Sequence, residues 1–322
     1  AMVTAWRGNE LVMALPMMVR NSFGVSILEV MSGPDAEYQA PIFAENIDQK
    51  ALFAAVLNDL SNNHKFDILR LNSTPVDAEI CELANPEYRL QSELEYSSII
   101  ELTDFENLDS YLATRSKNSR KSIRRKMQAF EKLGNVQSVT HPVTEDYKTR
   151  VFPQICQWKR DWFDANGILG GNFNCSDMEE QLEALCQTND KSQPALATEL
   201  ILDGKLVACD IMLQENGILY SYVTARDLSY DKYGLGTVLD MHTIRYAIEN
   251  NFSAIDLLAG PNPSKESLST KKVPILDLRF PLTTKGNWQA SIDRLRARDH
   301  IKTGFYKLPI GIRQSVLRLK SK

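Results

Sequence analysis

Apolar and polar positions alternate through the first hundred residues in short runs typical of strands, separated by stretches with helical spacing. The predicted strands are Val3–Trp6, Leu11–Val19, Val25–Val30, Phe66–Leu71 and Tyr88–Leu102. A helix capped by Asn46 or Asp48 and running to Asn62 is expected between them, with a shorter helix over Asp77–Leu83. This order predicts a mixed α/β domain.

The rest of the chain begins with helical patterns and then contains a three-strand meander. Helices are predicted over Phe105–Leu133, Glu145–Asn166 and Asp177–Cys186, with a strand over Val136–Thr140. Three antiparallel strands follow at Ala195–Leu202, Leu206–Leu213 and Ile218–Thr224, because Asp203-Gly204-Lys205 and Asn216-Gly217 are tight-turn sequences. The remaining elements are a helix over Leu235–Asn250, strands over Ala254–Leu258 and Ile275–Leu282, and a helix over Asn287–Tyr306.

Both halves of the chain show a hairpin followed by a helix and then a strand. A chain of 322 residues is long enough for about two domains of ~100–200 residues each. We therefore expect a mixed α+β protein with an N-terminal domain over residues 1–104 and a C-terminal domain over residues 105–322. The shared order indicates duplication of one domain type.

Composition narrows the class of protein. Net charge is only −4, which is unlike a general DNA-binding protein, yet Arg115–Lys126 holds seven basic residues and no acidic one. The five cysteines are widely spaced without a CxxC pair, so we expect reduced thiols, a cytoplasmic location and no metal site. No apolar run is long enough to span a membrane. The basic C-terminal stretch Arg294–Lys322 is a candidate for peripheral membrane contact.

The segment richest in chemical information is the loop Asp231–Thr237, which contains Gly234 and Gly236 and leads directly into a helix. Glycines let successive backbone N–H groups converge on one point, and a helix start adds unpaired N–H groups and partial positive charge. Together these features predict a binding site for a phosphate or pyrophosphate group. A dinucleotide fold or a P-loop needs a different glycine spacing, so neither is indicated.

Three segments carry a family resemblance: the basic run Ser116–Arg125, the loop from Tyr222 to Gly236, and Ile255–Gly260 followed by Lys265. Here the chain resembles GNAT-type acyltransferases of the CelD-like group, which are related to the FemAB-like double-GNAT enzymes. The resemblance implies tandem GNAT-like domains with mostly antiparallel central sheets flanked by helices. It also implies acetyl-CoA or another acyl-CoA as donor, and a small-molecule, glycan or envelope-precursor amine as acceptor.

The resemblance and the pattern together suggest individual site residues. Asp256 matches a family position for a general base, Asp210 is a second candidate base, and Tyr222 is a candidate acid for the leaving thiolate. The expected donor-binding residues are Val223, Thr224, Tyr233, Gly234, Leu235, Gly236 and Thr237. The expected substrate-binding residues are Arg120, Lys121, Arg124 and Lys265.

Two alternatives stay open at the level of sequence. One is a FemAB-like transferase that uses aminoacyl-tRNA, in which the basic helix would meet the nucleic acid. The other is a non-catalytic GNAT scaffold in a polysaccharide-biosynthesis complex. The scaffold is favoured by Asp231, which stands where GNAT loops usually carry Gln or Arg. It is also favoured by the altered loop around Asn262, in which Pro261 and Ser264 stand where the CelD-like pattern has an acid and a tyrosine.

Overall fold

The structure is a computed structural model, and it describes residues 2–31, 38–63, 65–166, 175–186, 194–260, 263–295 and 308–313. The chain forms two compact units. Unit 1 comprises Ala1–Ser97, Ala259–Pro261 and Lys272–Lys307, and unit 2 comprises Ser98–Leu258, Asn262–Lys271 and Leu308–Lys322. The expectation that residues 1–104 and 105–322 each form a GNAT-like domain stays a prediction.

In its described residues, unit 1 is a sheet with a helix on each face. Its strands are β1 (Met2–Arg7), β2 (Glu10–Ser22), β3 (Val25–Val30), β4 (Ile42–Phe43), β5 (Ile68–Pro75), β6 (Arg89–Glu101, which continues into unit 2) and β12 (Lys271–Pro281), in the order β1-β2-β3-β5-β12-β6 with β4 beside β2. Its helices are α1 (Gln49–Asn63) and α9 (Thr284–Arg294), with 3₁₀ turns at Glu79–Leu83 and Pro86–Tyr88.

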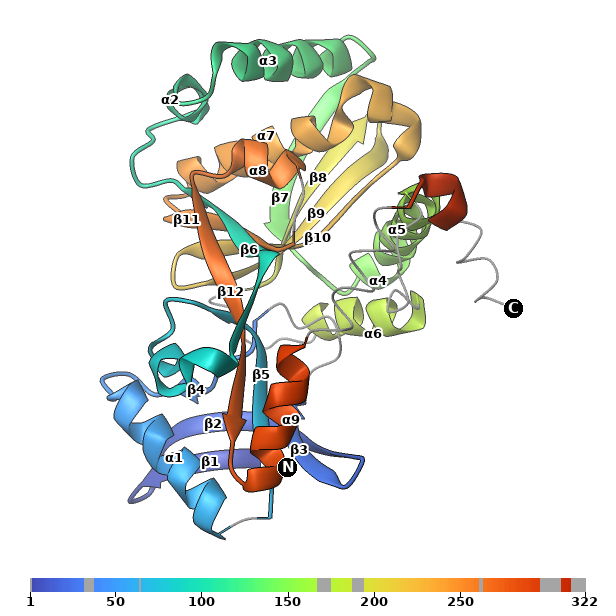
Figure 1. Cartoon of the computed structure of the whole chain (residues 1–322). Helices are drawn as coiled ribbons and strands as arrows, with labels where there is room; N and C mark the ends of the chain where they lie inside the picture. Colours follow the sequence, from blue (N-terminus) through green and yellow to red (C-terminus); the bar gives the residue numbers. More distant parts are fainter. Residues whose placement is uncertain are drawn as a thin grey trace. The chain divides into compact units, whose positions relative to one another are not determined.

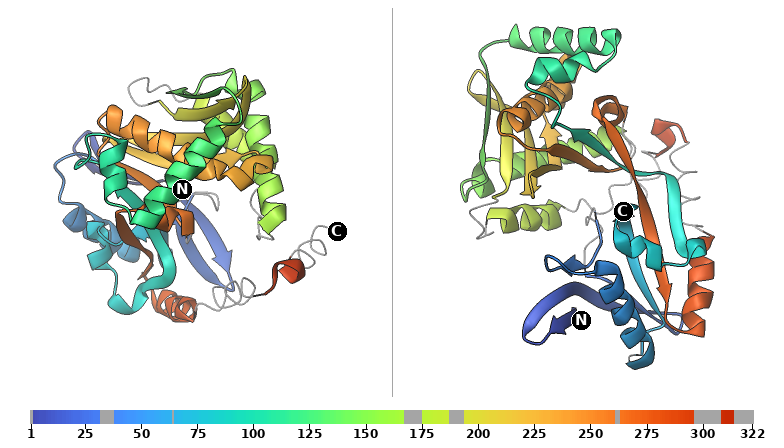
Figure 2. Two further views of the ribbon diagram at one scale, coloured as in Figure 1. Left: turned by 90° about the horizontal axis from the view of Figure 1, so that it is seen from above. Right: turned by 90° about the vertical axis from the view of Figure 1, so that its left-hand side faces the viewer.

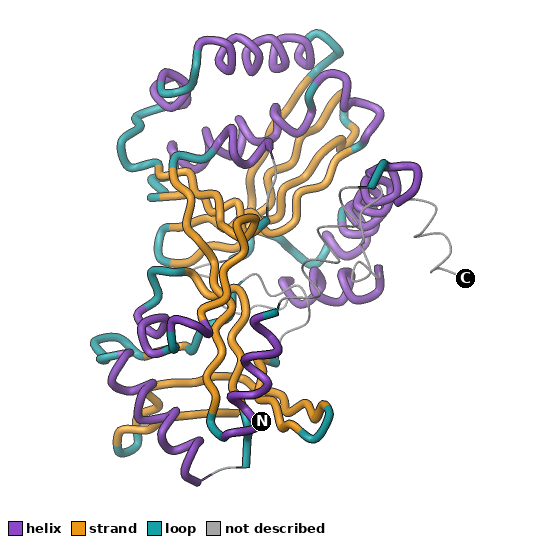
Figure 3. The backbone as a smooth tube through the Cα atoms, in the orientation of Figure 1, coloured by secondary structure: helices purple, strands orange, loops and turns teal. Residues whose placement is uncertain are grey.

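The alternation of side chains along β3 and β5 explains these two layers. Leu28 and Leu69 join the apolar cluster that packs under α1, around Phe53. Their neighbours Ile27 and Ile68 point to the other face, where they pack against α9. The two helices therefore cover opposite faces of the unit 1 sheet (Figure 3).

Unit 2 is a second sheet with a larger set of helices. Its strands β7 (Val136–Pro142), β8 (Leu196–Leu202), β9 (Lys205–Glu215), β10 (Ile218–Arg226) and β11 (Ala254–Ala259) take the order β6-β11-β10-β9-β8-β7. Its helices are α2 (Leu108–Ala113), α3 (Lys117–Glu131), α4 (Tyr147–Arg150), α5 (Phe152–Asn166), α6 (Cys175–Cys186), α7 (Leu235–Glu249) and α8 (Pro263–Leu268), with a 3₁₀ turn at Leu228–Tyr233.

The helices of unit 2 divide between the faces of its sheet (Figure 1). Helix α7 buries Val238, Leu239 and Ile244 in the apolar clusters on one face, and α3 lies alongside α7 (Figure 2). Helices α4, α5 and α6 pack on the other face around Phe152 and Ile155. The sheet is thus sandwiched between α7 and α5, as the apolar stripe of the predicted 235–250 helix requires.

Most predicted elements are confirmed, and the exceptions have local causes. The predicted helix over 105–133 is two helices, because Asn107 caps α2 by accepting from the Ser110 N–H and Ser116 caps α3 by accepting from the Ser119 N–H. The predicted Glu145–Asn166 helix breaks before Pro153, which lacks an N–H for a continuing helix. Residues 79–83 form a 3₁₀ rather than an α-helix. Helix α9 begins earlier than predicted, and residues 296–306 lie outside the described residues.

The expected mixed α+β class is confirmed, with mostly antiparallel sheets. Among the strand pairs of the described residues, β3 with β5 in unit 1 and β10 with β11 in unit 2 are parallel. A helix connects the two strands of each pair, α1 in the first case and α7 in the second. Such a crossover is how parallel neighbours are joined.

Candidate functional site

The central feature of unit 2 is that β10 and β11 are paired over only part of their length. The parallel register joins Ile218–Tyr220 to Ala254–Asp256 and stops there. On its other side β10 stays paired with β9 to Arg226, with a register shift between Ser221 and Val223. The second half of β10 therefore presents backbone groups on the side where β11 has turned away, an edge to which an extended ligand can hydrogen-bond.

The glycine loop occupies the end of this opening. Gly234 has φ of 74°, a left-handed conformation, and serves as the N-cap of α7 without a side-chain cap. A Cβ at Gly234 would lie 2.5 Å from Cδ of Lys126, so the close approach of α3 also requires glycine here. The first N–H groups of α7 and its partial positive charge are directed at the opening.

A cavity of about 470 Å³ fills the space between these elements, a size in the usual range for small-molecule sites. The predicted residues Tyr222, Thr224, Gly234, Leu235, Gly236, Thr237 and Lys265 all line it. Val223 and Tyr233 do not: Val223 is buried in the cluster under α5, and Tyr233 packs beside Phe130. The structure thus brings most of the predicted donor segment to one cavity.

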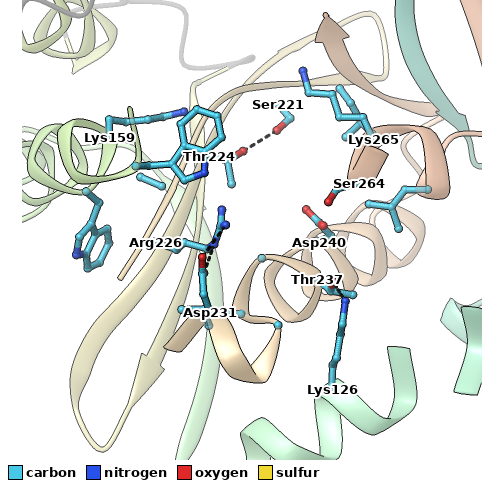
Figure 4. Close-up of a pocket in the computed structure, with 18 of the residues that line it drawn as sticks. Lys126, Lys159, Ser221, Thr224, Arg226, Asp231, Thr237, Asp240, Ser264 and Lys265 are labelled. Carbon is cyan, nitrogen blue, oxygen red and sulfur yellow. Dashed lines mark hydrogen bonds and ion pairs between the residues drawn. The ribbon is translucent and has the colours of Figure 1, made fainter. Parts of the chain in front are cut away.

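Asp231 does not leave an unbalanced negative charge beside the glycine loop. The Arg226 guanidinium donates two hydrogen bonds to the Asp231 carboxylate, at 2.7 and 3.2 Å (Figure 4). Arg226 also lies 3.6 Å from where a Gly236 side chain would begin, so the cation sits at the helix start. Arg226, at the end of its strand, was not among the residues selected from the sequence, and the adjacent Lys232 lies over the Tyr233 ring.

Sequence reasoning also missed Asp240, whose carboxylate projects from α7 into the cavity (Figure 4). Burial and the neighbouring charge of Asp210 raise the pKa of Asp240 to about 7, although Arg226 and Lys126 act in the opposite direction. A carboxylate with a pKa in this range can accept a proton near neutral pH. Asp240 lies four residues after Gly236 on the same helix, so the two share one face of α7.

Asp210 lies one layer behind the cavity wall. Its carboxylate accepts hydrogen bonds from the hydroxyls of Ser221 at 2.9 Å and Thr224 at 2.8 Å, and both of these residues line the cavity. Burial raises the pKa of Asp210 to about 6 despite these donors, and Thr243 of α7 adds a weaker contact at 3.5 Å. Only 4% of Asp210 is exposed, so its carboxylate lies inside the protein and not on a solvated strand face.

Asp256 and Tyr222 differ in their relation to the cavity. The Asp256 carboxylate is buried and accepts from the N–H of Leu258 at 2.8 Å, where the backbone takes a positive φ of 63°. Asp256 is not among the residues that line the cavity. Tyr222 does line it, and its hydroxyl donates to the Gln181 side chain of α6 at 3.1 Å.

The basic helix α3 contributes to the cavity through a residue that sequence reasoning did not select. Lys126 donates to the Thr237 hydroxyl at 3.0 Å and lines the cavity. Of the selected cations, Arg120 donates to the Ala113 carbonyl, Arg124 pairs with Asp109 at 3.2 Å, and Lys121 is exposed. These three lie outside the cavity wall.

Helices α5 and α8 complete the lining of the cavity. Trp158, Lys159 and Trp162 belong to α5, and Ser264 and Lys265 to α8, a short helix that was not predicted. Lys265 donates to the Leu258 carbonyl at 3.4 Å.

The described residues contain no cluster of His, Cys, Asp or Glu that could hold a metal ion. None of the helices in the described ranges is long and apolar enough to cross a membrane.

Comparison with known proteins addresses the class of this site. Residues 117–266 match the model of the acetyltransferase (GNAT) domain family, and this stretch contains all the residues named above for the cavity. Over this stretch, which is a little under half of the chain, the protein is similar to GNAT acetyltransferase domains. The domain belongs to the acyltransferase class of enzymes, and the match does not single out the CelD-like group within it.

Two solved structures are similar in fold across both units. A structure of FemX shares 9% identity at a TM-score of 0.57, over 90% of this chain and 89% of that one. A conserved protein of unknown function from Bacteroides thetaiotaomicron VPI-5482 shares 15% identity at a TM-score of 0.52, over 85% of this chain and 81% of that one. No curated protein matches the chain in sequence. At these identities the likeness concerns the fold alone.

Proposed function

We propose that the protein is an N-acyltransferase that moves an acyl group directly from acyl-CoA to the amine of a small molecule or an envelope or polysaccharide precursor. The observation that carries the proposal is the partly unpaired edge of β10, which ends at the glycine start of α7 inside the matched domain. The strand edge can hydrogen-bond to the extended thioester arm of the donor, and the helix start can bind its pyrophosphate.

The donor is assigned to the wall formed by β10 and the start of α7. The pyrophosphate would be held by the N–H groups after Gly234, with Arg226 and Lys126 supplying positive charge. The extended thioester arm would lie along the edge of β10 from Ser221 to Thr224. Helix start and strand edge together orient the thioester, and holding two reactants in line supplies a large part of the rate.

The proton balance of the transfer assigns roles to two side chains. The acceptor enters as an ammonium ion and gives one proton to the Asp240 carboxylate, which is the ionisable cavity group with a suitable pKa. The freed nitrogen forms a bond to the acyl carbon while the carbon–sulfur bond breaks. The departing thiolate takes a proton, for which we propose the Tyr222 hydroxyl of the cavity wall once it has left its hydrogen bond to Gln181, and an amide and a free thiol result.

The charge distribution indicates where the acceptor enters. Asp240 and the buried Asp210 make the interior side of the cavity acidic, which favours a cationic amine. Lys159 of α5 and Lys265 of α8 also line the cavity, where they suit an anionic group of the same acceptor. We therefore favour an acceptor with an amine and an anionic group, as in amino acids or in precursors bearing phosphate or carboxylate.

A second donor class is favoured by one observation. Lys117, Lys121 and Arg125 of α3 are exposed, and the helix as a whole lies against α7 at the cavity. A cationic helix next to a donor site suits an aminoacyl-tRNA, whose phosphates would bind there in a salt-dependent manner. This donor would be indicated by tRNA binding whose affinity falls steeply between 50 and 200 mM salt, as is typical when about 6–10 phosphates are contacted.

Calorimetric titration with acetyl-CoA and a long-chain acyl-CoA tests the proposal. We expect saturable binding that weakens at least tenfold in Gly236→Glu, because the new carboxylate would lie beside Arg226 and the pyrophosphate. The matched control is Gln137→Glu, which adds the same charge at an exposed position of β7. If neither thioester binds, or if both variants weaken binding equally, the acyl-CoA assignment is wrong.

A further inference from the structure

Unit 1 contains a cavity of its own, which the family match does not cover. The cavity has a volume of about 900 Å³ and lies between the tip of the β2–β3 hairpin and helix α9. Both walls belong to unit 1, and the matched segment 117–266 contributes none of the lining residues. Its volume is within the range of pockets that hold drug-sized molecules.

One wall of this cavity is an apolar stripe that faces outward. Helix α9 buries Gly286 and Ala290 against the sheet, and a Cβ at Gly286 would collide with the Asp67 carbonyl at 1.8 Å. Lys285, Trp288, Gln289 and Ile292 follow the spacing of one helical face and line the cavity. Trp288 is 72% exposed and Ile292 56% exposed, although a helix normally presents polar side chains on its solvent side.

The hairpin tip extends the same apolar surface. Phe23 lies at the cavity and is fully exposed. Its φ of 50° is unusual for an aromatic residue, because the left-handed region favours glycine, asparagine and aspartate. A position that demands such a conformation and is open to water would ordinarily carry a small polar residue. Phe23, Trp288 and Ile292 together make a wall suited to an aliphatic or aromatic ligand.

The base of the cavity carries positive charge. Arg70 lines it and is only 8% exposed. Its Nη2 donates to Asp293 at 2.7 Å, but Asp293 also accepts from Arg279 at 2.9 Å and from Gln289 at 2.9 Å. One carboxylate thus serves two guanidinium groups, and the Nε of Arg70 has no hydrogen-bond partner within the described part of the chain. A buried N–H donor without a partner destabilises the protein, so an acceptor that reached it would bind favourably.

Two further cations border the cavity and no described carboxylate lines it. Arg20 lies on β2, where it pairs with Glu29 at 2.8 Å, and Lys285 is exposed on the first turn of α9. Of the nearby carboxylates, Glu29 and Asp293 are each paired with an arginine, and Asp67, which lies near Lys285, accepts hydrogen bonds from the Ser26 N–H and the Thr283 hydroxyl. The cavity is therefore electropositive at its base and rim and apolar along its sides.

We infer that this cavity binds a single-chain amphiphile with an anionic head, whose head contacts Arg70 and Lys285 and whose chain lies along Phe23, Trp288 and Ile292. The buried guanidinium selects the charge of the head, and the exposed apolar wall contributes by removing the chain from water. A cavity enclosed on two sides favours one molecule of ligand over a flat membrane surface. The inference does not rest on the acyltransferase proposal, since it concerns a different unit.

The test is calorimetric titration of the full chain with decyl phosphate below its critical micelle concentration. We expect one molecule to bind per chain, and affinity to fall at least tenfold in Trp288→Ser and in Lys285→Glu. Both positions are exposed, so these variants should fold as the parent does. The matched controls are Ile42→Ser and Lys65→Glu, which change exposed residues of unit 1 away from the cavity and should leave affinity unchanged.

Comparison ligands separate the head from the chain. Decyltrimethylammonium, with the same chain and the opposite charge, should not bind, and inorganic phosphate alone should bind at least a hundredfold more weakly. Arg70→Gln should weaken decyl phosphate as well, while Arg279 remains to pair with Asp293. Equal binding of the two decyl compounds would overturn the inference. So would unchanged affinity in the Trp288 and Lys285 variants, or binding to phosphatidylglycerol vesicles without binding of the monomeric amphiphile.

Discussion

At the scale of single residues, the sequence located the loop but not the carboxylate that faces the cavity. Asp256 was chosen through the family resemblance, and its role as a base stays a prediction; in the structure it holds the N–H of Leu258 at a strained turn. Asp240 carries no motif signal of its own. Its identity as a cavity residue depends on which face of α7 meets the opening, and that is decided by tertiary packing.

Replacing Asp240 by asparagine tests its proposed role as proton acceptor. For the parent we expect kcat/KM to rise with pH up to about 7 and then level, since the ionised form is the active one. In Asp240→Asn, kcat should fall at least a hundredfold, which is the usual contribution of a general base. The rise of kcat/KM with pH should also disappear in this variant. The control is Asp256→Asn, in which the rise of kcat/KM with pH should be retained. If that rise disappears in Asp256→Asn and not in Asp240→Asn, the assignment is wrong.

The same variant has an expected effect on stability that separates chemistry from folding. The pKa of Asp240 is higher in the folded protein than the ordinary value near 4, so the folded chain holds a proton that the unfolded chain has released between about pH 4 and 7. Stability from this group is present below that interval and is lost as pH rises through it. Thermal unfolding at pH 8 should therefore show Asp240→Asn to be at least as stable as the parent.

At the scale of elements, the pattern of the chain predicted the strands and helices well, because periodicity and turn residues are local. The meander β8–β10 was set by Asp203-Gly204 and Asn216-Gly217, and both Asp203 and Asn216 adopt positive φ in the structure. What escaped the pattern is the divergence of β10 from β11 after Tyr220, because strand separation depends on contacts far apart in sequence. The short α8, which closes the cavity, also has no periodic signal.

The start of α7 offers a test at this scale through two glycines with similar backbones. Gly234→Ala should destabilise the protein by about 1–2 kcal/mol, the cost of a left-handed alanine, and should weaken acetyl-CoA because Lys126 must move away. Gly217→Ala, with φ of 77° and only ordinary contact near its Cβ, should cost similar stability without affecting acetyl-CoA. Chemical denaturation measures the change in stability, and calorimetry measures the affinity for acetyl-CoA. An equal loss of affinity in both variants would contradict a donor-binding site at Gly234.

At the scale of the whole molecule, the two units share an order of elements but differ in chemistry. Each has an antiparallel pair, a helix and a parallel strand: β2-β3-α1-β5 in unit 1 and β9-β10-α7-β11 in unit 2. We propose that one domain type was duplicated, as the repeated pattern in the sequence indicated. The segment between β3 and α1 contains the single glycine Gly33, whereas that between β10 and α7 contains Gly234 and ends at the Gly-Thr start of the helix. Of these two sequence segments, the one in unit 2 has the glycine spacing of the proposed donor loop.

The most direct test of the central claim is backbone hydrogen exchange of the full chain with and without acetyl-CoA. We predict slower exchange at residues 221–226 and 235–240, where the strand edge and the helix start would hold the donor, with β3 and α9 of unit 1 unchanged. Protection confined to unit 1, or no protection at saturating acetyl-CoA, would contradict the assignment of the donor site to unit 2.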